Sequence, residues 1–146
     1  MDEPVLFYER EYYVFSNFSS FAIEWKGRVW MTSEHVYHSE RFDDTKMKDE
    51  IHSMRSAHDA FTYAQVNKLL QRKDWNDIKT VVMKKILHAK VVQHAYVKKK
   101  LLESGSREII ENSWQDDFWG WGANKDGKNM LGKLWMEVRD EVRQSA

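Results

Sequence analysis

The chain of 146 residues contains no cysteine. It therefore has no disulfide bonds and no thiolate metal sites, and nothing indicates an oxidising compartment. The first ten residues, MDEPVLFYER, lack a cationic segment followed by an apolar one, so we expect no signal peptide. No apolar run approaches the roughly 18 residues of a membrane span. We expect a cytoplasmic protein that does not engage a membrane.

Net charge is also missing, because 23 Lys and Arg balance 23 Asp and Glu. A strongly electrostatic nucleic-acid binder normally carries a basic excess. The balance argues against that class, although it allows a small local phosphate site. With one proline and no low-complexity segment or repeat, we expect one domain over residues 1–146.

Aromatic residues are abundant, at 14 % of the chain with seven Trp. Most of these rings should pack in the core, but some could stack on a base or a sugar. Periodicity and turn signals predict a mostly helical α+β fold with a small antiparallel sheet. The predicted strands are 5–8 and 108–111, with a hairpin at 22–31. The predicted helices are 33–42, 45–54, 56–70, 75–90, 93–103 and one from residue 130, which follows a long loop at 112–129.

Glu34 follows Thr32 and Ser33, which are natural N-cap residues, and so lies in the first turn of a predicted helix. At 100° per residue, Glu34 shares one helix face with Tyr37, His38 and Arg41. A carboxylate in the first turn is already favoured by the helix dipole. Two interpretations stay open on this stretch: a plain helix cap, or the acid of an active site.

A second pattern lies in the predicted helix 75–90, where spacings of 4, 4, 3 and 4 align five residues on one stripe: Trp75, Lys79, Met83, Ile86 and Lys90. We predict that a neighbouring stripe faces the core instead: Ile78, Val82 and Ala89. The two lysines could extend to the surface. Alternatively they line a cavity and face a phosphate or a reactive sugar carbon.

The third pattern is DDFWGWG, Asp116 to Gly122, in the long loop. Two carboxylates lie beside two indoles, and the glycines allow close backbone approach. This composition suits a flat ligand, while a loop that packs its own aromatic rings is the alternative.

Other patterns carry less information. Glu34 with His35 and His38 has a weak metal-ligand spacing and no supporting third cluster, so we expect no metal and no cofactor. The run Lys98-Lys99-Lys100 is typical of a solvated helix face. Neither a phosphate-binding loop motif nor a nucleophile-elbow motif occurs.

Taken in order, these stretches resemble the NADAR family, also called the YbiA-like or DUF1768 domain. The matching segments are FY (7–8), FSNFS (15–19), W-x-TSEH (30–35), W-x3-K-x3-M (75–83), AK (89–90), D-x-x-WG-x-G (116–122) and GKNMLGKLWMEVR (127–139). The resemblance covers nearly the whole chain. It implies a YbiA-like α+β fold and an N-glycosidase activity without a cofactor.

Some members of that family cleave ribose phosphate from ribosylaminopyrimidine intermediates of riboflavin synthesis. Others remove ADP-ribose from guanine in nucleotides or nucleic acid, as repair enzymes or as antitoxin partners of ADP-ribosyltransferases. The resemblance thus implies as substrate a small nucleotide or ribosylated base, or ADP-ribosylated nucleic acid, and as a protein partner an ADP-ribosyltransferase toxin. The sequence does not choose between these substrates.

Carried over by position, the resemblance indicates Glu34, Trp75, Asp116 and Trp119 as functional residues. We expect Glu34 to act on the sugar side, and Asp116 to position the ribose hydroxyls or serve as the partner acid. Lys90 is the candidate for a covalent variant through a Schiff base. The predicted substrate-binding residues are Asn17, Phe18, Arg41, Trp75, Lys79, Trp119 and Asn129.

The chain departs from the family pattern at two places, Met31 and Arg41. Where the family often has a lysine, Arg41 keeps the charge and adds a planar fork that suits a phosphate. Two other classes of protein stay open. A non-catalytic module that binds ADP-ribose or NAD would need the aromatic and basic residues but not the carboxylates, and a structural interaction domain would bind no nucleotide.

Overall fold

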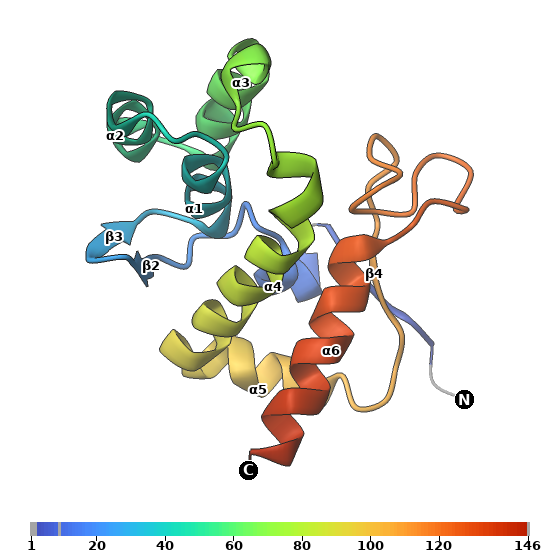
Figure 1. Cartoon of the computed structure of the whole chain (residues 1–146). Coiled ribbons are helices and arrows are strands. Elements are labelled where there is room, and N and C mark those ends of the chain that lie inside the picture. Colours follow the sequence, from blue (N-terminus) through green and yellow to red (C-terminus); the bar gives the residue numbers. More distant parts are fainter. Residues whose placement is uncertain (1–2, 9, 146) are drawn as a thin grey trace. The chain divides into compact units, whose positions relative to one another are not determined.

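The computed structural model describes residues 3–8 and 10–145. The chain divides into two compact units (Figure 1). The terminal unit combines Met1–Ser16 with His94–Ala146, and the central unit is Asn17–Gln93. The prediction of one domain over residues 1–146 stays a prediction.

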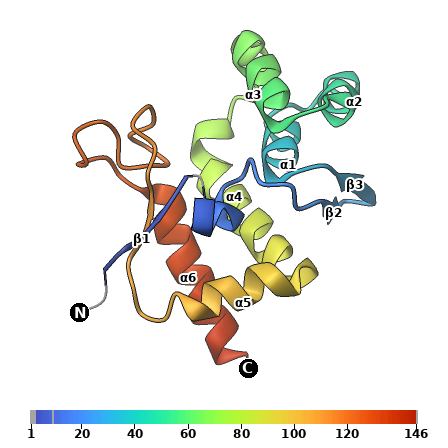
Figure 2. The ribbon, with the colours of Figure 1, turned by 180° about the vertical axis from the view of Figure 1, so that it is seen from behind.

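The terminal unit contains two short strands and three helical elements. In chain order they are β1 (Val5–Phe7), the 3-10 helix η1 (Arg10–Phe15), α5 (Ala95–Glu103), β4 (Ile109–Glu111) and α6 (Met130–Gln144). β1 pairs in parallel with β4, with Val5 opposite Ile109. Figure 2 shows β1, α5 and α6 of this unit. A loop of irregular structure joins β4 to α6 and carries the DDFWGWG motif.

Three buried aromatic side chains hold the terminal unit together. The ring of Phe15 packs against Phe7 at 5.9 Å between centroids and against Trp135 at 5.1 Å. The indole Nε1 of Trp135 also donates a hydrogen bond of 3.0 Å to the carbonyl oxygen of Phe15. The buried indole thus has its polar atom satisfied, as a Trp in a core requires.

The packing of α6 on β4 depends on Gly132 and Asn129. A Cβ at Gly132 would lie 2.0 Å from the carbonyl oxygen of Ile109. Asn129 has a φ of 49° just before the helix. Its Oδ1 accepts from the backbone N of Glu111 at 2.9 Å, and its Nδ2 donates to the carbonyl of Ile109 at 2.9 Å. Asn129 therefore forms hydrogen bonds with the backbone of β4 that a neighbouring strand would otherwise form.

The central unit begins with an antiparallel hairpin, β2 (Ile23–Trp25) and β3 (Arg28–Trp30). Its turn residues Lys26 and Gly27 have φ of 50° and 82°. Two positive φ values in a two-residue turn match the twist of the strands. The hairpin predicted over residues 22–31 is confirmed.

The rest of the central unit is helical: α1 (Ser33–Glu40), α2 (Thr45–Ser53), α3 (Ala57–Val66), the 3-10 turn η2 (Lys68–Leu70) and α4 (Trp75–Gln93). α1 packs against α2, α3 and α4, and every one of its residues is buried. Three polar side chains cap the first three helices: Thr32, Asp44 and Ser56. A short polar helix can be this buried only because its neighbours surround it.

The fold class, mostly helical with a small antiparallel sheet, is confirmed. Three details differ from the prediction. The parallel pair β1–β4 joins strands about one hundred residues apart, and local sequence patterns carry no signal for such a pairing. The 3-10 helix η1 was not predicted, and the helix predicted over 56–70 ends at Val66 before the separate turn η2. Among the described residues no helix is long and apolar enough to cross a membrane.

We predict that Gly132→Ala destabilises the protein, because the new methyl group would overlap backbone that cannot move away. The free energy of unfolding, measured by urea denaturation, should fall by at least about 2 kcal/mol. Lys133→Ala is the matched control on the exposed neighbouring position and should change it by less than about 0.5 kcal/mol. Equal stability of the two variants would contradict the close approach of α6 to β4.

Candidate functional site

The cap of α1 is Thr32 and not Glu34. The Oγ1 of Thr32 accepts a hydrogen bond of 3.2 Å from the backbone N of His35. The backbone N of Glu34 donates to the carbonyl of Asn17 at 3.1 Å. These bonds satisfy the start of the helix without the Glu34 side chain. Its carboxylate is therefore available for another purpose, and the residue as a whole is 7 % exposed.

That carboxylate ends a line of polar groups along one face of α1. The Oε2 of Glu34 lies 2.7 Å from the Nε2 of His38. Because a carboxylate only accepts, the Nε2 of His38 donates and carries the proton. The Nδ1 of His38 then accepts from Nη1 of Arg41, at 3.5 Å the long end of the hydrogen-bond range. Arg41 thus fixes the imidazole, and the imidazole fixes the carboxylate.

Arg41 is itself held by neutral groups. Its Nε donates to Oε1 of Gln71 at 2.8 Å, and its Nη1 donates to Oε1 of Gln65 at 3.3 Å. Burial lowers the pKa of Arg41, while Tyr37 and Glu34 act in the opposite direction. A guanidinium stays charged at neutral pH in proteins. The two amides orient its positive charge without neutralising it, as a site for a phosphate requires.

Trp75, the first residue of α4, packs against the same face of α1. Its indole and the ring of Tyr37 have centroids 5.0 Å apart and planes inclined by 55°. The indole is 2 % exposed, so it supports Tyr37 and, through it, His38, whose ring lies 5.1 Å from that of Tyr37. The substrate-stacking role predicted for Trp75 stays a prediction.

The prediction of which α4 stripe faces the core was wrong. The residues that are buried along α4 include Trp75, Met83, Ile86 and Lys90, whereas Ile78, Val82 and Ala89 are only partly buried. The reason is that α1 and β2 pack against the first stripe. Lys79, on that same stripe, is half-buried. Periodicity identifies two stripes but not which of them meets the neighbours.

Lys90 is a fully buried amine at the end of the buried stripe. Its side chain has no exposed surface, and its Nζ donates to the Oγ of Ser19 at 3.0 Å. It also lies 5.3 Å from the ring centroid of Phe21. Desolvation lowers the pKa of Lys90 to about 7. The amine is therefore largely uncharged slightly above neutral pH, the state in which a lysine is a nucleophile.

Unpartnered polar atoms lie beside Glu34 in the chain and in space. The Nδ2 of Asn17 contacts the Sδ of Met83 at 3.3 Å. Within the described part of the chain, its Oδ1 and the Oγ of Ser33 are buried without a hydrogen-bond partner. Such atoms are rare in folded proteins and are commonly explained by a ligand or water. Phe18, the next predicted binding residue, is 37 % exposed.

Three predicted site residues belong to the terminal unit: Asp116, Trp119 and Asn129. The Oδ1 of Asp116 accepts from the backbone N of Phe118 at 2.9 Å and of Trp119 at 2.8 Å. This oxygen therefore shapes the loop. The ring of Trp119 packs edge-on against Phe118 at 4.8 Å. Both amide atoms of Asn129 bond to the backbone of β4, a structural role that the sequence did not reveal.

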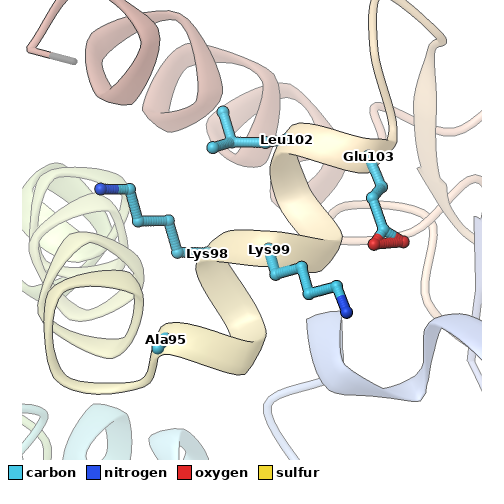
Figure 3. Close-up of a pocket in the computed structure, with 5 residues that line it drawn as sticks. All are labelled: Ala95, Lys98, Lys99, Leu102 and Glu103. Carbon is cyan, nitrogen blue, oxygen red and sulfur yellow. The ribbon is translucent and has the colours of Figure 1, made fainter.

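The lysine run on α5 does not form a shared anion site. A pocket there is lined by Ala95, Lys98, Lys99, Leu102 and Glu103 (Figure 3). The side chains of Lys98 and Lys99 extend away from each other, so they do not converge on one ligand. As for metals, no group of three or more His, Cys, Asp or Glu that could hold an ion occurs in residues 3–8 and 10–145.

Comparison with known proteins decides the family. The model of the NADAR domain matches residues 6–143. The chain belongs to the NADAR family. Among its curated relatives, N-glycosidase YbiA of Escherichia coli is 36 % identical over 132 residues, which cover 90 % of this chain and 82 % of that protein. An N-glycosidase of Nostoc punctiforme is 36 % identical over 95 % of this chain and 92 % of its own length.

A riboflavin biosynthesis protein of Vibrio vulnificus is 34 % identical over all of this NADAR chain, which spans 40 % of that longer protein. The solution structure of Escherichia coli YbiA has a TM-score of 0.91 to this chain at 35 % identity, covering 99 % of this chain and 87 % of that one. The recognised family and the YbiA-like fold are confirmed.

The candidate site of this NADAR protein includes residues that were not predicted as site residues. His38 had one available signal, its position four residues after Glu34, which placed the two on one helix face. Gln65 and Gln71 gave no signal, since neutral amides on a helix and a turn are common everywhere. Of the predicted residues, the central unit brings Glu34, Arg41 and Trp75 to one face of α1.

We predict a pH-dependent stability that depends on Lys90. Above pH 7 the folded amine loses its proton, while the unfolded chain keeps it up to about pH 10. The unfolded state then binds more protons, so the free energy of unfolding should rise between pH 7 and 9.5. Urea denaturation should show that Lys90→Met removes a rise of at least about 1.4 kcal/mol, equal to one pKa unit.

Lys85→Met is the matched control on the exposed face of α4. It should keep the wild-type dependence on pH. If the wild type and Lys90→Met have parallel stability profiles between pH 7 and 9.5, Lys90 is charged in the folded protein.

Proposed function

We propose that this NADAR protein is an N-glycosidase that hydrolyses the bond between a base-type amine and a phosphorylated ribose. One observation carries the proposal: the Glu34 carboxylate is buried, is not used as a helix cap, and is oriented by His38 and Arg41. The names of the N-glycosidase relatives support the same reaction class.

The chemistry explains why a fixed carboxylate is useful. Cleavage of an N-ribosyl bond builds positive charge at the anomeric carbon and negative charge on the departing nitrogen. Glu34 would stabilise the first charge or deprotonate the attacking water. His38 holds the carboxylate in place, which lowers the cost of orienting it during the reaction. The guanidinium of Arg41 would bind the phosphate of the ribose.

The substrate belongs to one of two classes: a base such as guanine carrying ADP-ribose, or a ribosylaminopyrimidine phosphate of riboflavin synthesis. Both present a phosphorylated ribose linked to nitrogen, the shared feature that Glu34 and Arg41 suit. The roles of Asp116 and Trp119 are proposed on the family resemblance alone. Asp116 would position ribose hydroxyls or protonate the departing base, and Trp119 would stack on the base.

We predict that Glu34→Gln lowers turnover of these substrates by at least about 100-fold, the usual loss when a general acid or base is removed. The amide keeps the size of the side chain, so the thermal unfolding midpoint should stay within a few degrees. The assay incubates the enzyme with ADP-ribosylated guanosine, guanine-ADP-ribosylated DNA and the riboflavin intermediate, and compares kcat/KM.

Glu24→Gln is the control at an exposed position on β2 and should keep full activity. Wild-type turnover by Glu34→Gln would reduce Glu34 to a structural residue. Binding of ADP-ribose or NAD without hydrolysis of any of the three substrates would instead support the alternative, a non-catalytic binding module.

A second route is favoured by the lowered pKa of Lys90. The uncharged Nζ attacks the anomeric carbon, the bond to the base breaks, and the base leaves with a proton. Opening of the ribose ring then gives an imine between the sugar and the lysine, and water hydrolyses this imine to release the sugar. Because Nζ is fully buried, this route requires Ser19 and Phe21 to move aside.

Borohydride trapping distinguishes the two routes. If Lys90 forms an imine, borohydride added during turnover will reduce it to a stable amine, and mass spectrometry will place the sugar on the peptide that contains Lys90. Lys90→Arg should then give no adduct on that peptide. Absence of an adduct on every lysine, Lys79 included, rules the covalent route out and leaves direct hydrolysis.

A further inference from the structure

The turn that follows α3 exposes apolar side chains that the site does not explain. Leu69 is 98 % exposed and Leu70 65 %, and Val66 at the end of α3 is 79 % exposed. We refer to residues 66–73, which join α3 to α4 (Figure 1), as the α3–η2 tip. Single exposed apolar residues are common, but a cluster of them indicates an interaction surface.

The tip is an ordered turn. The backbone N and the Nδ2 of Asn67 both donate to the carbonyl of Tyr63, at 3.1 and 2.8 Å. The backbone N of Leu70 donates to the carbonyl of Asn67 at 2.9 Å. The leucines are thus held outward before any partner arrives, which reduces the entropy that binding would cost.

Basic residues flank the two leucines. Lys68 precedes them and Lys73 follows, and both are exposed. Arg72 bonds to Asp74 at 2.6 Å and therefore contributes less positive charge. Positive side chains that flank an exposed packing surface suit a nucleic-acid strand, because the lysines neutralise phosphates while the bases pack on the surface between them.

The tip is also attached to the candidate site. The side chain of Gln71 accepts from Nε of Arg41 at 2.8 Å, and the backbone N of Arg72 donates to the carbonyl of Arg41 at 3.0 Å. A strand that rests on the tip would therefore lie next to the residue that is proposed to bind the phosphorylated ribose.

We propose that the α3–η2 tip is a docking surface for a nucleic-acid strand that carries the ribosylated base. Leu69 and Leu70 pack against the bases beside the modified one, and Lys68 and Lys73 bind the flanking phosphates. The inference rests on the proposed function for the identity of the modified base, and it goes beyond that function because a free nucleotide would not reach such a surface.

Binding is measured separately from catalysis. The probe is a fluorescent single-stranded oligonucleotide with one ADP-ribosylated guanine, made as DNA and as RNA to distinguish the two sources, with Glu34→Gln protein to prevent turnover. Adding Leu69→Ser and Leu70→Ser should weaken binding at least about tenfold, because the apolar surface that packs on the bases is removed. Val92→Ser is the control, at an apolar position on α4 that is 68 % exposed, and should leave binding unchanged.

The lysines are tested by their dependence on salt. With Lys68→Glu and Lys73→Glu, the slope of log K against log salt should become shallower by about 1.4, or 0.7 for each phosphate that a lysine no longer neutralises on a single strand. Lys46→Glu and Lys85→Glu make the same charge change at exposed positions on α2 and α4, and should alter the slope much less.

The comparison of kcat/KM on two substrates decides whether the tip acts on the strand. In otherwise wild-type protein, the leucine changes should lower kcat/KM on the modified strand about tenfold and leave ADP-ribosylated guanosine unaffected. Equal losses on both would mean that the tip acts only through Arg41 and would overturn the proposal. Three other results would also overturn the proposal. The first is strand binding that the leucine changes leave unaltered. The others are a wild-type dimer that these changes convert to monomer, and a protein partner that binds the tip in place of the strand.

Failure of the proposed function has a different signature. In that case the wild type hydrolyses none of the three substrates, while the binding measurements still report whether the tip holds a strand.

Discussion

The candidate site depends on the hydrogen bond between Glu34 and His38. A carboxylate that loses its water must find a donor, because burying it without one is costly. His38 is that donor, at 2.7 Å, and Arg41 gives the imidazole its direction. Glu34 and His38 belong to α1, whose eight residues are all buried, and Arg41 follows as its C-cap. The burial of α1 among α2, α3 and α4 is therefore the constraint on which the site rests.

The same central unit contains a second buried ionisable group, Lys90. It differs from Glu34 in the kind of group that it bonds to: its Nζ donates to a hydroxyl, and its pKa falls to about 7 as a result of desolvation. Burying an amine lowers the stability of the fold, and ionisable groups with strongly shifted pKa values cluster at functional sites. The two proposed routes, direct hydrolysis with Glu34 and covalent catalysis with Lys90, are chemically distinct, and trapping separates them.

Sequence reasoning succeeded where local signals were strong. The Lys26-Gly27 turn and the start of α4 at Trp75 were recovered, and the cap, predicted at Thr32 or Ser33, lies at Thr32. Turn and cap chemistry is local, so such signals can be found in the sequence. It failed on the buried face of α4, where Ile78, Val82 and Ala89 were expected in the core. Two stripes of one helix can both look apolar, and only the neighbouring elements select between them. It also missed the parallel pairing of β1 with β4.

The sequence by itself determined the helical character, the family resemblance and the position of Glu34 in the first turn of α1. Tertiary structure decided the burial of its side chain. Since Thr32 provides the cap, the Glu34 side chain is directed to His38. Packing likewise lowers the pKa of Lys90 to about 7, and it places the amide of Asn129 against the backbone of β4. The desolvation of Lys90 and the bonds of Asn129 to β4 come from packing between segments that are distant in the sequence, and no local pattern encodes them.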